Sequence, residues 1–123
     1  MLEILIADDS RLMRMMLSRI LVQAGHNILG EAANGLEAVQ KYFELKPHLV
    51  MMDIGMPILN GVEAVKLIKS KDPDANIIIC SSMGRAETIR EAIYTGARDY
   101  IVKPFQPDRI IKSIDRLYNF NHE

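Results

Sequence analysis

Three aspartates and a lysine stand where apolar runs of the sequence come to an end. Asp8 and Asp9 follow the run EILIA, and Asp53 follows LVMM. Lys103 follows DYIV. Two adjacent carboxylates beside an apolar run are costly to ionise, because each negative charge raises the pKa of the other. The pattern therefore predicts either a cation among these carboxylates or a carboxyl group with a strongly raised pKa.

The chemistry that suits this set is phosphoryl transfer with a hard metal ion. The evident ligands are carboxylate oxygens, with no His or Cys pair nearby, so they suit Mg²⁺ or Mn²⁺ rather than zinc. Asp53 can attack phosphorus as a nucleophile and form an aspartyl phosphate. Lys103 can pair with one phosphate oxygen, and the hydroxyl of Ser81, after the run IIIC, can donate to another.

Each of these residues also has a purely structural explanation. Asp9 or Ser10 can cap the N-terminus of a following helix. Asp53 can be a turn residue, Ser81 a loop hydroxyl and Lys103 a solvated charge. Their joint appearance in this order, each at the end of an apolar run, favours the chemical interpretation.

Those residues need elements that bring them together. Short apolar runs alternate with stretches of helical periodicity, which predicts five βα units. The predicted strands are residues 3–7, 27–32, 49–52, 76–81 and 99–102, and the predicted helices are residues 11–24, 36–45, 61–71, 86–95 and 107–120. The strand runs do not alternate polar with apolar, so we expect an α/β fold with a parallel sheet covered by helices on both faces. In such sheets functional groups gather at the carboxyl ends of the strands.

Composition narrows the setting. The chain has 123 residues, 49% of them hydrophobic, which predicts one domain over residues 1–123. A formal charge of -1 gives no overall attraction to nucleic acid. Cys80 stands alone, which fits a reducing compartment. Without a secretory signal or a run long enough to span a bilayer, we expect no membrane insertion and a cytoplasmic location.

Several motifs then carry a resemblance across essentially the whole chain. They are ILIADDSRLMR, the NG before the second predicted helix, LVMMDIGMPILNG, IIICSSMG and GARDYIVKPF, in this order. The chain resembles the receiver domain of two-component response regulators, and most of all the CheY-like chemotaxis regulators. The resemblance implies a flavodoxin-like (βα)5 fold with strand order 2-1-3-4-5, for which CheY is itself a standard example. The stretch KPF followed by QPDRI resembles chemotaxis and motility regulators in particular.

The resemblance assigns a role to each residue of the site. Asp53 is the implied phosphoacceptor and a Mg²⁺ ligand. Asp9 is an implied direct ligand, Asp8 acts mainly through coordinated water, and the backbone carbonyl of Gly55 completes the protein ligands. Lys103 is expected to contact the phosphoryl group, and the peptide bond that follows it, to a proline, is expected to be cis.

The resemblance also implies a switch and its partners. A sensor histidine kinase is the expected phosphodonor. After phosphorylation Ser81 gains a charge-assisted hydrogen bond, and Tyr100 rotates into the space that opens. The expected readout is a changed surface around residues 86–95, Tyr100 and residues 109–116, which binds a downstream target protein. The protein would act as a monomer or as a dimer that forms on activation, and the only reaction it would catalyse is its own phosphorylation and dephosphorylation.

Two neighbours of the site offer no polar side chain to hold an attacking water. They are Gly55, two residues after Asp53, and Met83, two residues after Ser81. We therefore expect hydrolysis of the phosphoaspartate to rely on little more than the metal and Lys103.

Other functions stay open at this point. The chain could be a receiver excised from a larger regulator with a transcriptional or enzymatic output. A Mg²⁺-dependent phosphohydrolase with an aspartate nucleophile typically carries a second Asp two residues later, where this chain has Gly55. A flavin-binding carrier on the same fold would meet repulsion between its phosphate and Asp8 and Asp9.

Overall fold

The computed structural model describes residues 1–82 and 86–118. Along this part of the chain strands and helices alternate, in the order β1 (Glu3–Ala7), α1 (Arg11–Gln23), β2 (Asn27–Ala32), α2 (Gly35–Leu45), β3 (Leu49–Asp53), α3 (Gly61–Lys71), β4 (Ile77–Ser82), α4 (Ala86–Thr95), β5 (Asp99–Lys103) and α5 (Pro107–Tyr118). The predicted type of every element is confirmed, with ends that differ by one or two residues. Asp53 and Lys103 are the last residues of their strands rather than the first residues after them. Met83 and the predicted end of the last helix at 119–120 lie outside the described residues.

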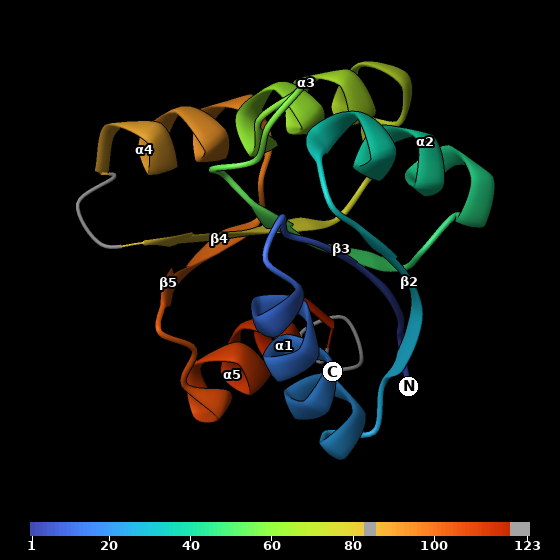
Figure 1. Ribbon diagram of the computed structural model, residues 1–123, viewed down its shortest axis with the longest axis vertical. Helices are drawn as coiled ribbons and strands as arrows, with labels where there is room; N and C mark the ends of the chain where they lie inside the picture. Colours follow the sequence, from blue (N-terminus) through green and yellow to red (C-terminus); the bar gives the residue numbers. More distant parts are fainter. Residues whose placement is uncertain (83–85, 119–123) are drawn as a thin grey trace.

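The sheet is parallel, and its strand order is β2-β1-β3-β4-β5, as the resemblance implied. The chain leaves β1 for β2 on one side and returns to β3 on the other, so the strand order reverses between β1 and β3. Helices α1 and α5 cover one face of the sheet, and α2, α3 and α4 cover the other (Figure 1). The ends of β1 and β3 therefore meet at the place where α/β sheets commonly hold their ligands.

Two apolar layers hold the helices on the sheet. The central strands are buried on both faces, as the unbroken apolar runs predicted, and Ile4, Leu5 and Ile6 are successive side chains without exposed surface. Leu17 and Leu21 of α1 pack into one layer, and Ala64 and Ile68 of α3 belong to the other. None of the described helices is long and apolar enough to cross a membrane.

Local capping brings two loops to the same edge of the sheet. Ser10 caps α1, where its hydroxyl accepts a hydrogen bond of 3.2 Å from the amide of Met13. Asn60 and Glu63 form a capping box at the start of α3. A Cβ atom at Gly61 would lie 2.2 Å from the carbonyl oxygen of Asp53, so only glycine lets α3 begin this close to the end of β3.

Candidate functional site

Three carboxylates meet at the carboxyl ends of β1 and β3. Asp8, Asp9 and Asp53 each offer an oxygen atom, and these atoms lie within 4.8 Å of one another. Asp8 is 3% exposed and Asp53 is 7% exposed, whereas Asp9 faces solvent. The predicted convergence of these three residues is confirmed, because β1 and β3 are neighbours in the sheet. We call Asp8, Asp9, Asp53 and the lysine described next the carboxylate cluster.

Lys103 bridges two of the carboxylates. Its Nζ atom lies 2.8 Å from Oδ2 of Asp8 and 3.1 Å from Oδ1 of Asp53. The lysine reaches them from the last residue of β5, and the peptide bond to Pro104 is cis, as expected. The ammonium group thus already ties together two strands that carry the carboxylates.

The pKa values at this edge reflect burial together with an excess of negative charge. Burial and then the charge of Asp8 raise the pKa of Asp53, against the opposing effect of Lys103. Burial alone would lower the pKa of Lys103, but the hydrogen bond that Lys103 donates to Asp8 and the charges of Asp53 and Asp8 outweigh it, and the pKa is raised. One ammonium faces three carboxylates, so a divalent cation would offset the remaining repulsion. A donor set made only of oxygens suits Mg²⁺.

Other residues expected at the site lie near it without touching the carboxylates. Ser81 is 1% exposed, and its hydroxyl donates to the carbonyl of Ser82 at 3.2 Å. No hydrogen bond joins it to Asp53 or Lys103 in the described part of the structure. Gly55 is exposed, two residues after the end of β3, and Tyr100 on β5 is 40% exposed.

One contact at this edge was not expected from the sequence. Arg14 of α1 donates from Nη1 to the backbone carbonyl of Asp8, at 2.7 Å. The same side chain donates from Nε to Oε1 of Glu31 at 2.8 Å. The loop that carries Asp8 and Asp9 is therefore held from α1 as well as from the sheet.

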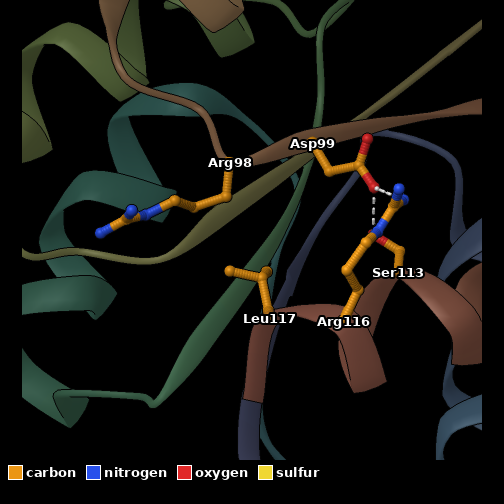
Figure 2. Close-up of a pocket in the computed structure, with 5 residues that line it drawn as sticks. All are labelled: Arg98, Asp99, Ser113, Arg116 and Leu117. Atoms are coloured by element: carbon orange, nitrogen blue, oxygen red, sulfur yellow. Dashed lines mark hydrogen bonds and ion pairs between the residues drawn. The ribbon is translucent and has the colours of Figure 1, made fainter. Parts of the chain in front are cut away.

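A second ionic group, which we call the Asp99 cluster, ties β5 to α5 and was also not expected. The carboxylate of Asp99 accepts hydrogen bonds from Ser113 Oγ at 2.6 Å, Arg116 Nη2 at 3.0 Å and Arg109 at 3.3 Å. Figure 2 shows Ser113 and Arg116 reaching Asp99 from α5. Arg109 also donates to the carbonyl of Tyr100 at 2.8 Å. Burial would raise the pKa of Asp99, but these hydrogen bonds outweigh it and the pKa is lowered.

Comparisons with known proteins agree with this geometry. The model of the response regulator receiver domain matches residues 4–115. The chain is 53% identical to the chemotaxis protein CheY of Thermotoga maritima over 114 residues, which cover 93% of this chain and 95% of that protein. It is 50% identical to the chemotaxis protein CheY of Bacillus subtilis over 116 residues, which cover 94% and 97%.

A solved structure shows the same fold. The CheX-CheY-BeF3-Mg+2 complex from Borrelia burgdorferi matches with a TM-score of 0.90 at 30% identity, over 94% of this chain and 88% of that chain. Its likeness extends the sequence matches to the arrangement of the whole sheet. The carboxylates at the strand ends, the strand order and these matches together show that the chain belongs to the response regulator receiver domain family of two-component signalling, as a CheY-like member.

Proposed function

We propose that residues 1–123 form a single receiver domain that acts as a phosphoacceptor switch, with Asp53 as the acceptor. The observation that carries the proposal is the carboxylate cluster, in which Asp53 lies beside Asp8 and Asp9 and is bound by Lys103. The family assignment favours this function over a phosphohydrolase or a flavin carrier. Its CheY relatives support a role in chemotaxis.

The proposed reaction moves a phosphoryl group from a histidine of a sensor kinase to Asp53. An oxygen of Asp53 forms a bond to phosphorus while the P–N bond of the phosphohistidine breaks, and the electron pair stays on the imidazole nitrogen of the donor. Lys103, already 3.1 Å from Oδ1 of Asp53, would bind a phosphoryl oxygen. Positioning and electrostatics supply most of the catalysis in such a transfer.

Asp8, Asp9, Asp53 and the carbonyl of Gly55 are the residues that would hold the metal ion. When bound, Mg²⁺ would neutralise charge on the phosphoryl oxygens. The all-oxygen donors favour Mg²⁺, with Mn²⁺ as a possible substitute. The presence of Mg²⁺ in the Borrelia CheY complex supports the same choice.

The switch would connect this site to the surface of α4, β5 and α5. Within the described residues the Ser81 hydroxyl donates only to the carbonyl of the next residue, so it is available to a phosphoryl group on Asp53. Tyr100 is 40% exposed and lies on β5, between Asp99 and the strand end that carries Lys103. A change at the site can thus reach Tyr100 through a single strand.

That surface has the character of a protein-binding site. Exposed apolar side chains occur on α4 and β5, where Tyr94 is 94% exposed and Tyr100 is 40% exposed. Three cations of α5, Arg109, Lys112 and Arg116, line a hollow, and Arg109 also contacts the carbonyl of Tyr100. A downstream target protein would bind here, to a monomer or to a dimer that forms on activation, in the cytoplasm.

The first experiment is the intact mass of the protein after incubation with acetyl phosphate. We expect one phosphoryl increment on the wild type that requires Mg²⁺ and is absent from Asp53→Asn. An increment that persists in Asp53→Asn would place the acceptor elsewhere. The absence of any increment on the folded wild type with Mg²⁺ would contradict the phosphoacceptor function.

A further inference from the structure

Arg14 connects three elements around the carboxylate cluster. It lies in α1, four residues after the capping residue Ser10, and its amide donates to the Ser10 carbonyl at 3.0 Å. Its guanidinium binds the carbonyl of Asp8 at 2.7 Å and the carboxylate of Glu31 on β2 at 2.8 Å. The Arg14 side chain is only 16% exposed. A charged side chain that is this buried and makes two short, divergent contacts is held in one orientation.

The contact with Asp8 fixes the backbone of the loop that carries two carboxylates. The amide of Asp8 donates to the carbonyl of Ala32 at 3.0 Å, and the carbonyl of Asp8 accepts from Arg14. Both backbone groups of Asp8 are therefore tied, one to β2 and one to α1. The carbonyl of Asp8 is part of the peptide unit between Asp8 and Asp9. Holding this carbonyl therefore fixes the orientation of that peptide plane and of the backbone of Asp9.

Glu31 holds the guanidinium in turn. The pair of contacts uses two sides of the planar fork of Arg14, which a lysine has no means to reproduce. The backbone carbonyl of Glu31 also accepts a hydrogen bond from Lys41 of α2, so the residue is anchored at both its backbone and its side chain. The chain of contacts runs from β2 through Arg14 to the Asp8–Asp9 peptide.

We propose that Arg14 is a positioning residue for the divalent cation, which orients the Asp8–Asp9 peptide so that the carboxylates of the cluster can share one ion. It does not touch the ion. The inference rests on the proposed function, because it takes that site as the place of the metal. Removing a group that orients a metal ligand typically weakens metal binding by roughly 10- to 100-fold.

The charge of Arg14 by itself predicts a change in Mg²⁺ affinity in the opposite direction. Arg14 carries a positive charge next to a site for a cation, so removing that charge would by itself strengthen Mg²⁺ binding. Loss of positioning would weaken it. The direction of the change therefore separates a positioning role from a simple charge effect.

The test is the Mg²⁺ dissociation constant of the purified full chain, measured by titration calorimetry with MgCl₂. For Arg14→Met we expect the dissociation constant to rise roughly 10- to 100-fold. Arg14→Lys keeps the charge and reaches one acceptor, so its dissociation constant should rise less. The matched control is Arg19→Met, which removes the same charge from an exposed position of α1 whose side chain has no hydrogen bond or ion pair to the other described residues. It should bind Mg²⁺ as tightly as the wild type or more tightly.

A second readout separates positioning from damage to the reaction. With acetyl phosphate, Arg14→Met should need more Mg²⁺ for half-maximal phosphorylation, while the rate at saturating Mg²⁺ stays close to that of the wild type. Unchanged or tighter Mg²⁺ binding in Arg14→Met would overturn the proposal. If that variant does not fold, Arg14→Lys decides: weaker binding supports the proposal, and binding equal to the wild type overturns it.

The proposed function fails in a different way. A folded wild type that binds no Mg²⁺ and gains no phosphoryl group would refute the site itself. A wild type that binds Mg²⁺ and is phosphorylated, beside an Arg14→Met variant of equal affinity, would refute only the role of Arg14.

Discussion

The carboxylate cluster and the Asp99 cluster are built from the same kinds of group in opposite proportions. In the first, three carboxylates lie together, and the ammonium of Lys103 binds two of them, Asp8 and Asp53. In the second, one carboxylate receives two arginines and the hydroxyl of Ser113. Burial and then the charge of Asp8 raise the pKa of Asp53, whereas at Asp99 the hydrogen bonds outweigh burial and the pKa is lowered.

The difference separates a group that is ready to react from one that is already satisfied. Asp53 is buried with too little positive charge around it. A cation, or a phosphoryl group together with its metal ion, would offset the electrostatic repulsion in the carboxylate cluster. Asp99 has its donors in place and holds α5 to the edge strand of the sheet. Carboxyl groups with shifted pKa values occur in both structural and functional sites, and here it is the direction of the shift that distinguishes them.

Without metal, the largest effect of a substitution is expected from Asp99→Asn. The change removes the charge that binds Arg109 and Arg116 and leaves an amide beside Ser113. Because both arginines are partly exposed and water can replace some of the lost contacts, we expect the free energy of unfolding to fall by about 2 kcal/mol. Urea unfolding followed by circular dichroism measures the change.

Asp115→Asn is the matched control for that experiment. Asp115 lies on the same helix and is exposed. Its substitution should change the free energy of unfolding by less than about 0.5 kcal/mol. Equal losses in the two variants would show that the Asp99 cluster does not have the structural role that the comparison gives it.

A smaller effect of the opposite sign is expected from Asp53→Asn. In buffer with a chelator, the neutral amide removes a buried charge that Asp8 repels, so the free energy of unfolding should rise by about 1 kcal/mol. With Mg²⁺ at about 100 times its dissociation constant, the wild type should gain about 2.7 kcal/mol and the order should reverse. If Asp53→Asn lowered the free energy of unfolding without metal, the charge of Asp53 would already be balanced by its neighbours, as that of Asp99 is.

Acid should remove the contribution of Asp99. Its pKa is lowered in the folded protein, so its stabilisation is present above the ordinary aspartate pKa and is lost as the pH falls through the folded pKa. The difference in unfolding free energy between wild type and Asp99→Asn should therefore be constant above about pH 5 and shrink below about pH 4. Urea midpoints of both proteins across this range measure it, and a difference that stays constant in acid would contradict the lowered pKa.

Much of the fold followed from the pattern of apolar runs. Strands buried on both faces leave unbroken runs, and helices leave a longer period, so the alternation of elements was visible in the residues. The order of the strands was not, because runs such as EILIA and LVMM do not say which neighbour they pair with. That order came from the resemblance. The positive φ of Ile58, at 69°, also had no signal, because a β-branched residue rarely adopts it.

The candidate site, like the fold, could be predicted from the sequence only in part. The carboxylates and Lys103 were predicted because carboxyl ends of parallel strands meet at one edge. Arg14 was missed, although its place four residues after the cap Ser10 is a signal that it faces back along the helix. The Asp99 cluster was missed because its members come from β5 and α5, and no spacing in the sequence tells how that helix lies on the strand. Contacts between elements needed the structure.

The smallest expected effect concerns how long Asp53 stays phosphorylated. It tests whether the carboxylate cluster lacks a polar side chain that could hold the attacking water. Gly55 offers no side chain to an attacking water, and it is not among the described glycines with positive φ, so its φ does not require glycine. In Gly55→Asn an amide close to the acceptor could hold that water, and we expect the phosphoaspartate to decay roughly threefold faster, a change of less than about 1 kcal/mol in the barrier. Decay is measured by intact mass after removal of acetyl phosphate, with Gly55→Ala as the control for bulk alone. Met83→Glu tests the corresponding position after Ser81. Equal decay rates in the wild type, Gly55→Asn and Met83→Glu would show that side chains at these two positions do not limit the attack of water on the phosphoaspartate. The metal and Lys103 would then set its lifetime by themselves.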